Sequence, residues 1–270
     1  MVAAYRARAT RGPDALCSDP WAAGLAGDEG DELARRLEES QPFVALWVAL
    51  RTGFLDERIA RWTRPNGDAT QVVMLGAGLD TRAARLARDG VRFFEVDQPS
   101  SQADKRARLE RIDGYPVDAA TYVRCDFERD DFLERLAEGG FESGAPAVIV
   151  WEGVTPYLTE QAVRATLRRV ATGCHPRSVL LFDFLGSKIA LGNVRHQEDV
   201  QTRELVEELG EPLRWGTNDA LPMLYEEGFR KARVTSFDEI ALNRTGTYER
   251  VRKWRFQSIA ECSVVAEAGT

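Results

Sequence analysis

The chain has 270 residues, a hydrophobic fraction of 44% and a formal net charge of −7. This length and apolar content suffice for one large α/β domain, or for a domain with an appended lid. The negative charge argues against a broad nucleic-acid-binding surface, which would need a basic stripe. No apolar run approaches the roughly 20 residues of a membrane span. We therefore expect neither nucleic acid nor a membrane as a partner.

The few cysteines and histidines argue against a metal site. The four cysteines are scattered, with no CxxC pair: Cys17, Cys125, Cys174 and Cys262. Free thiols in a reducing cytoplasm are the expected state, and no metal is expected. The N-terminal segment "MVAAYRARATRG" is basic but has no apolar core behind it, so it does not predict a secretory signal.

The N-terminal region is predicted to be helical. The stretch "PFVALWVALRTGFLDERIARW" carries apolar residues at helical spacing, and the turn-rich segment "TRPNGDATQ" follows it. We therefore predict an N-terminal helical cover over residues 1–68. Residues 69–270 are predicted to form a second domain, with a polar lid or inserted helix near 187–212.

Beyond residue 68, short apolar runs alternate with helical patterns. The predicted strands cover 72–75, 91–96, 121–125, 147–151 and 179–184, and helices are predicted near 80–89, 100–112, 129–138 and 159–173. The alternating stretch "VRKWRFQSIAECSVVAE" predicts a final strand. Near-continuous apolar strands separated by helices are typical of a parallel sheet covered on both faces. The predicted fold is a doubly wound, Rossmann-like α/β sheet.

The turn after the first predicted strand contains the glycines of "VVMLGAGLDTRAARL". Gly76 and Gly78 leave room for a ligand near the backbone, and in such sheets ligands bind where a strand turns into its helix. A tight turn without a ligand is the alternative. Asp97 ends the next strand, nineteen residues after Gly78, where an acidic residue binds ribose hydroxyls. Together these residues indicate a nucleoside ligand.

The sixth position of "GAGLDT" separates two classes of cofactor. Dinucleotide sites have a third glycine there, which allows close packing of helix and strand. This chain has Thr81 at that position. The sequence therefore favours S-adenosylmethionine (SAM) over NAD.

Four more residues fit SAM. Asp126 and Phe127 follow the third strand, where a carboxylate can accept from the adenine amino group and a ring can cover the base; a helix start capped by Asp126 is the alternative. Glu152 follows the apolar fourth strand and suits the cofactor's ammonium group, or an internal arginine. Arg51 follows the apolar stripe of its helix and suits the cofactor's carboxylate, or extends to solvent.

Taken together, these pieces resemble the leucine carboxyl methyltransferase family, in its bacterial branch of SAM-dependent O-methyltransferases. The matching segments are "CSDPWAAGLAG", "ALRTGFLDERI", "VVMLGAGLDTRAARL", "FFEVDQPSSQADKRARL", "VRCDF" and "WEGVTPYLTEQAV". The resemblance implies a class I methyltransferase sheet, mostly parallel with a reversed last strand. It also implies SAM contacts from Arg51, the Gly76–Gly78 loop, Asp97, the Asp126-Phe127 pair and Glu152. Phe127 and Pro156 depart from the family's usual pattern.

The predicted function is transfer of a methyl group from SAM to a carboxylate or hydroxyl of a small molecule, such as a polyketide-type secondary metabolite. Tyr157 and His196 are the candidate catalytic residues; a core aromatic and an exposed helix residue are the respective alternatives. An NAD(P)-dependent oxidoreductase is a second hypothesis, against which Thr81 and the lack of a Tyr-x-x-x-Lys motif count. A non-catalytic SAM-binding protein is a third.

Overall fold

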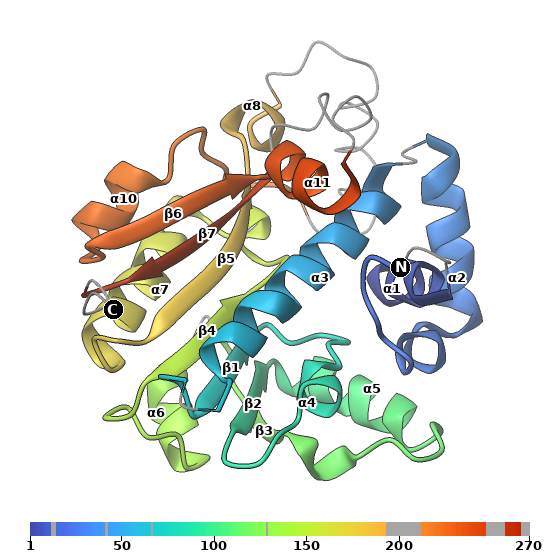
Figure 1. Ribbon diagram of the computed structural model, residues 1–270, viewed down its shortest axis with the longest axis horizontal. Helices are drawn as coiled ribbons and strands as arrows, with labels where there is room; N and C mark the ends of the chain where they lie inside the picture. The colour runs from blue at the N-terminus through green and yellow to red at the C-terminus, as the bar shows by residue number, and fades with distance from the viewer. Residues whose placement is uncertain are drawn as a thin grey trace. The chain divides into compact units, whose positions relative to one another are not determined.

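The computed structural model describes residues 1–11, 15–40, 43–65, 67–127, 129–192, 212–246 and 257–265. The chain divides into two compact units, Met1–Glu142 and Ser143–Thr270. Each unit has its own strands and helices, which are coloured along the chain in Figure 1.

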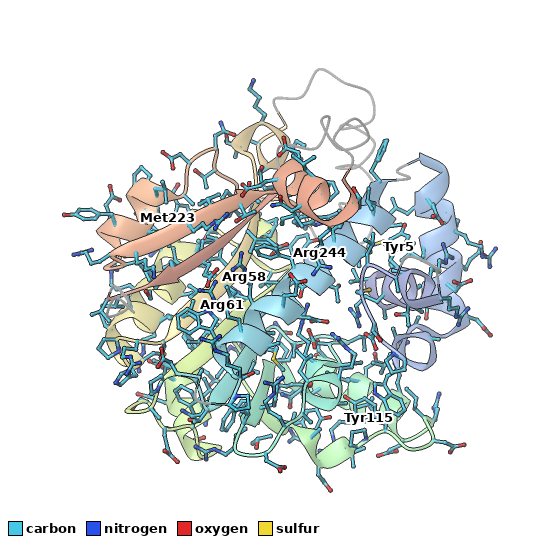
Figure 2. The ribbon with its side chains drawn as sticks, in the orientation of Figure 1. Tyr5, Arg58, Arg61, Tyr115, Met223 and Arg244 are labelled. Atoms are coloured by element: carbon cyan, nitrogen blue, oxygen red, sulfur yellow. The ribbon has the colours of Figure 1, made fainter. Side chains whose placement is uncertain are left out.

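The first unit begins with three helices, α1 (Val2–Arg11), α2 (Ala22–Ser40) and α3 (Phe43–Trp62). Helix α1 packs against α2 and α3. The buried Tyr5 of α1, labelled in Figure 2, donates its hydroxyl to the Ala34 carbonyl of α2 at 3.0 Å. The helix predicted from the apolar spacing before residue 62 is confirmed as α3.

Three parallel strands follow in the first unit. Strands β1 (Gln71–Leu75), β2 (Arg92–Asp97) and β3 (Thr121–Arg124) pair in parallel, with β2 in the middle. They alternate with α4 (Arg82–Arg85), α5 (Pro99–Leu109), a 3-10 turn (Val117–Ala119) and α6 (Phe132–Glu138). All five residues of β1 are buried, as expected for a strand covered on both faces. These strands and the helices α5 and α6 agree with the sequence predictions to within a few residues.

Helix α4 is much shorter than the helix predicted near residues 80–89. It covers only Arg82–Arg85, because Asp80 and Thr81 still belong to the turn before it. The chain then turns again at Gly90, whose φ of +78° lies in the left-handed region.

The second unit contains a parallel pair and a hairpin. Strands β4 (Ala147–Trp151) and β5 (Val179–Leu185) are parallel, whereas β7 (Gln257–Ser263) is antiparallel to both β5 and β6 (Lys231–Ser236). The sequence analysis predicted β7 and missed β6, because five of the six residues in "KARVTS" are not buried. The helical elements of this unit are a 3-10 turn (Thr155–Tyr157), α7 (Glu160–Gly173), α8 (Ser187–Ala190), α10 (Leu221–Glu226) and α11 (Phe237–Thr245).

The seven strands follow the order β3-β2-β1-β4-β5-β7-β6. The result is a mixed α/β fold whose sheet is mostly parallel, with the last strand reversed, as the sequence analysis predicted. Of the predicted lid near 187–212, the structure describes α8 at its start, and residues 193–211 lie outside the described residues.

Candidate functional site

The glycine turn that follows β1 folds back onto β2. Gly76 and Gly78 have φ values of +68° and +48°, which an L side chain rarely adopts. The backbone N–H groups of Gly76 and Ala77 both donate to the Val96 carbonyl, at 2.8 and 3.2 Å. The two glycines therefore let the turn bend sharply at the carboxyl end of the parallel strands.

Asp97, at the end of β2, is hydrogen-bonded to this turn. One of its carboxylate oxygens accepts from the Gly78 N–H at 2.6 Å, and the other accepts from the Gln98 N–H at 2.7 Å. Each carboxylate oxygen can accept a second hydrogen bond. The structure thus brings together two sequence features that were predicted to share one ligand, and the carboxylate can still accept from hydroxyl groups.

The space beside Gly78 is open. A Cβ atom placed there would meet no protein atom within 4 Å, whereas a Cβ at Gly67 would lie 2.5 Å from the Trp62 carbonyl oxygen. Packing thus requires a glycine at 67, whereas at 78 only the backbone conformation does. A ligand can approach the turn at Gly78 without displacing a side chain.

Asp126 and Phe127 follow β3, next to Asp97 in the sheet. The Cys125 N–H donates to the Asp97 carbonyl at 2.9 Å, so the two strand ends are joined directly before Asp126. Asp126 does not cap helix α6, because the Asp131 side chain accepts the hydrogen bonds at that helix start. Asp126 and Phe127 are both half-buried. The structure therefore removes the alternative interpretation of Asp126 as a cap.

Arg51 lies in the buried middle of α3. Only 7% of the residue is exposed, and its guanidinium lies 5.5 Å from the centre of the Trp47 ring. This burial contradicts the alternative in which its side chain extends to solvent. A buried guanidinium of this kind suits a carboxylate, to which it can donate two parallel hydrogen bonds.

A buried ion pair lies under the glycine turn. The Lys105 ammonium donates to a Glu95 carboxylate oxygen and to the Asp80 carbonyl, both at 2.5 Å. The two side chains are 2% and 1% exposed. Burial raises the pKa of Glu95 to about 7, although Lys105 beside it opposes that shift.

Further charged groups surround the start of α4. Arg82 pairs with Asp80 and, at 2.6 Å, with Asp56, and Arg85 also binds Asp56, at 2.5 Å. Burial opposes ionisation of Asp80, but Arg82 and the neighbouring cations hold the pKa of this carboxyl well below its usual range. Asp80 is therefore a fixed negative charge next to the turn.

The N-terminal helix also reaches this cluster. Arg6 of α1 donates to Asp19 at 2.7 Å and to the Leu79 carbonyl at 2.5 Å, and the Thr81 hydroxyl donates to Asp19 at 2.7 Å. The sequence analysis missed Arg6, Asp19 and Lys105. All three lie far from the glycine turn in the sequence, so no local pattern indicates that they reach it.

In the second unit, the turn that follows β4 carries Glu152 and Tyr157. Gly153 has a φ of +69° and donates its N–H to an Asp183 carboxylate oxygen at 2.6 Å, and the Thr155 hydroxyl donates to the Asp183 carbonyl at 2.6 Å. Glu152 and Tyr157 are half-buried. The sequence analysis missed Asp183, since an acidic residue inside an apolar strand gives no sign of its partner.

Pro156 is part of this turn and gives it a further connection. Its carbonyl accepts from the N–H groups of Arg214 and Trp215, at 2.7 and 3.2 Å. His196, the other predicted catalytic residue, lies outside the described residues.

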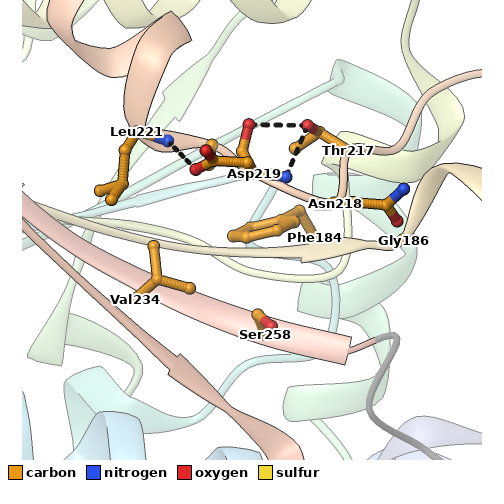
Figure 3. Close-up of a pocket in the computed structure, with 9 residues that line it drawn as sticks. Phe184, Gly186, Thr217, Asn218, Asp219, Leu221, Val234 and Ser258 are labelled. Carbon is orange, nitrogen blue, oxygen red and sulfur yellow. Dashed lines mark hydrogen bonds between the residues drawn. The ribbon is translucent and has the colours of Figure 1, made fainter.

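A cavity of about 230 Å³ opens in the second unit (Figure 3). Phe184, Val234 and Leu221 form apolar walls. At its edge the Thr217 hydroxyl donates to the Asp219 carbonyl at 2.8 Å and accepts from the Asp219 N–H at 3.2 Å. Successive side chains of a strand point to opposite faces. Phe184 and the cavity that it lines therefore lie on the face of β5 opposite the Asp183 side chain. Of the predicted site residues that the structure describes, none lines it.

The described part of the chain has neither a metal-binding cluster nor a membrane-spanning helix. No group of three or more His, Cys, Asp or Glu side chains there is arranged to hold a metal ion. Within the same residues, no helix is both long enough and apolar enough to cross a membrane. The four cysteines are all buried and free.

Comparison with known proteins identifies relatives across much of the chain. The model of the leucine carboxyl methyltransferase family matches residues 1–171. A Mycobacterium avium protein, provisionally named an S-adenosyl-L-methionine-dependent methyltransferase, is 37% identical over 60% of this chain, which spans 56% of that relative's length. A protein of the same provisional name from Mycobacterium sp. (strain JLS) is 34% identical over 73% of this chain and 72% of its own.

Solved structures share the fold at low sequence identity. A DUF574 family protein from Streptomyces avermitilis has a TM-score of 0.67 at 14% identity, with 97% of both chains covered. A provisionally named methyltransferase from Thermobifida fusca has a TM-score of 0.65 at 14% identity, covering 98% of this chain and 95% of that one. The glycopeptide N-methyltransferase MtfA, complexed with SAM, has a TM-score of 0.50 at 16% identity, covering 78% and 93%.

The raised pKa of Glu95 predicts a pH dependence of stability. A carboxyl whose pKa is about 7 in the folded protein and 4.5 ordinarily binds its proton more readily when folded. The stability it contributes is therefore complete below its unfolded pKa and is lost as pH rises through its folded pKa. The unfolding free energy of the wild-type protein, relative to that of Glu95→Gln, should therefore fall between pH 4.5 and about pH 7. This difference should change little at higher pH.

Urea denaturation of both proteins between about pH 5 and pH 8 measures this difference. A difference that stays constant across that range would mean that Lys105 keeps Glu95 ionised throughout, contrary to the prediction.

Asp183 is predicted to stabilise the turn that carries Glu152. Asp183→Ala removes the acceptor of the Gly153 N–H, and losing a hydrogen bond to a charged group should cost about 2 kcal/mol of unfolding free energy. Asp183→Asn keeps an acceptor oxygen at the same place and should cost less. Urea denaturation measures both variants, and equal midpoints for Asp183→Ala and wild type would contradict the assignment.

Proposed function

The chain belongs to the leucine carboxyl methyltransferase family, and from that premise we propose that it is a SAM-dependent methyltransferase. The main support for this proposal is the hydrogen bond that the Gly78 N–H of the glycine turn donates to the Asp97 carboxylate. It places a carboxylate beside backbone that a ligand can reach, with the Gly78 N–H only 2.6 Å from the acid. The two mycobacterial relatives described above carry provisional names of this activity.

The donor groups of the first unit fit the chemistry of SAM. Asp97 offers acceptor oxygens for ribose hydroxyls, and Asp126 offers one for the adenine amino group, with Phe127 as a cover for the ring. Arg51 is a buried cation that suits the amino-acid carboxylate. Glu152, in the second unit, is proposed to pair with the ammonium group. When bound, SAM supplies an activated methyl group on its sulfonium.

The acceptor is proposed to be an oxygen of a small molecule, such as a polyketide-type secondary metabolite. Methyl transfer from a sulfonium is an in-line displacement, in which positioning of the two reactants provides most of the rate. A carboxylate acceptor is already nucleophilic, whereas a hydroxyl acceptor benefits from a base. Tyr157 is the proposed group beside the acceptor, and His196 is the proposed base for a hydroxyl.

Thr81 supports SAM over a dinucleotide. This residue is completely buried, donates to Asp19 at 2.7 Å and accepts from Arg85 at 2.9 Å. A glycine at this position, as dinucleotide sites require, would leave both hydrogen bonds unmade. The four buried free thiols support a reducing location such as the cytoplasm, which is also a proposal.

The cofactor is tested by thermal unfolding of the purified chain with S-adenosylhomocysteine (SAH), NAD or NADP. A ligand at about 100 times its dissociation constant stabilises by about 2.7 kcal/mol, a shift of several degrees. We expect a shift with SAH alone. Asp97→Asn, which keeps the shape of the side chain but removes its charge, should weaken SAH binding by about tenfold or more. A shift with a dinucleotide alone would favour the oxidoreductase hypothesis.

A SAM-binding protein without catalysis predicts the same thermal shift, so turnover separates the two. Incubation with SAM and a panel of small carboxylates and phenols should release SAH only if a methyl group is transferred. SAH binding without release across the panel would favour the non-catalytic hypothesis.

Gly78 is predicted to matter more for the cofactor than for folding. Gly78→Ala places an L side chain in the left-handed region, at a cost of about 1 to 2 kcal/mol of unfolding free energy. Its methyl group then occupies the space through which the ligand reaches the backbone, so SAH binding should fall by far more than the loss of stability explains. Isothermal titration with SAH measures the effect.

Gly114→Ala is the matched control. Gly114 also has a positive φ, +76°, and open space at its Cβ position, but it lies in the loop after α5. It should lose similar stability and keep SAH affinity. Equal effects of the two substitutions on affinity would contradict a cofactor role for the glycine turn.

A further inference from the structure

We propose that Lys105 is a positioning residue, which holds the glycine turn in the shape that accepts the cofactor. This inference rests on the proposed function. It arises from one feature of the structure: a single buried ammonium donates both to the Glu95 side chain and to the Asp80 backbone carbonyl, each at 2.5 Å. The first of these partners lies on β2 and the second lies at the end of the turn.

The turn is held at both of its ends. At its start, the N–H groups of Gly76 and Ala77 donate to the Val96 carbonyl of β2. At its end, the Asp80 N–H donates back to the Ala77 carbonyl at 2.9 Å, and the Asp80 carbonyl accepts from Lys105. Without Lys105, a partly buried carbonyl at this end would lose its charged donor.

Glu95 connects the same ammonium to the residue that meets the ligand. Glu95 and Asp97 are two residues apart on β2, so their side chains point to the same face of the strand. Within the described residues, Glu95 Oε1 has no hydrogen-bond partner, so Lys105 is the group that fixes this carboxylate. Lys105 therefore links the turn and the strand that together present Gly78 and Asp97.

The position of Lys105 in α5 makes this link rigid. The helix begins at Pro99, two residues after Asp97, and the Gln102 amide donates to the Glu95 and Val123 carbonyls at 3.0 and 2.7 Å. The helix is thus bonded to β2 and β3 one turn before Lys105. An ammonium held on such a support needs little reordering when a ligand binds.

The test separates folding from binding by removing both charges together. In Lys105→Met/Glu95→Gln no charge stays buried without a partner, so this variant should be more stable than Lys105→Met, which leaves the Glu95 carboxylate without its cation. The Asp80 carbonyl nevertheless loses its donor. We expect the dissociation constant for SAH, measured by isothermal titration, to rise about tenfold, and hydrogen exchange of the peptide covering residues 76–80 to become faster.

Glu227→Gln is the matched control. Glu227 is a buried carboxylate of the second unit, paired with Arg164 at 3.0 Å and Arg168 at 2.8 Å, and its side chain is 2% exposed. Its substitution should change stability and leave both SAH affinity and the exchange of residues 76–80 unchanged.

A second double variant covers the case in which the first does not fold. In Lys105→Gln/Glu95→Gln the two amides can bond each other, while the shorter side chain at 105 falls short of Asp80. It should fold and still bind SAH more weakly. Either double variant, folded and binding SAH as tightly as the wild type with unchanged exchange at 76–80, would overturn the role of Lys105. Absence of SAH binding to the wild-type protein would instead overturn the proposed function.

Discussion

The hydrogen bond from the Gly78 N–H to the Asp97 carboxylate is the interaction on which the candidate site depends. It joins a turn after β1 to the end of β2, two positions nineteen residues apart in the chain. The parallel pairing of the two strands brings their carboxyl ends together, and the Val96 carbonyl holds the turn against the second strand. Both Asp97 carboxylate oxygens accept hydrogen bonds from backbone N–H groups, so the orientation of this side chain is fixed. The acceptor is therefore in place before any ligand arrives.

This arrangement rests on buried charges. Ionised groups are costly to bury unless each has a partner, and here Lys105, Arg82, Arg85 and Arg6 are each paired with a carboxylate. Two of these cations also donate to backbone carbonyls of the segment after the glycines, Arg6 to Leu79 and Lys105 to Asp80. Apolar side chains could fill the same space, but they could not satisfy those carbonyls. The charged cluster thus stabilises one conformation of the turn.

The sequence predicted the parts of the fold whose signal is local. A strand such as β4, "AVIVW", is apolar throughout because it is buried on both faces, and this short continuous apolar run identifies it. Strand β6 has no such pattern, because only Thr235 is buried, and it depends on pairing with β7. The predicted helix near 80–89 was too long because Asp80 and Thr81 are used in the turn and its ion pairs. Each of these departures arises from contacts between distant segments.

The same distinction applies to the site. Gly78, Asp97 and Asp126 were recognisable because each lies at the carboxyl end of a strand or within three residues after it, where ligands of such sheets bind. Lys105 and Asp183 were not, because the partner of a lysine in "ADKRAR" or of an aspartate in "VLLFDFL" is decided by the fold. The domain boundary at residue 68 and the roles of Tyr157 and His196 stay predictions.

A crystal structure of the chain with SAH tests the central claim most directly. We predict ribose hydroxyls within hydrogen-bond distance of Asp97, with Gly76 and Gly78 keeping their positive φ values and the Lys105 ammonium still bonded to the Asp80 carbonyl. SAH bound away from Asp97, or a glycine turn that changes its backbone conformation to admit the ligand, would contradict a preformed cofactor site.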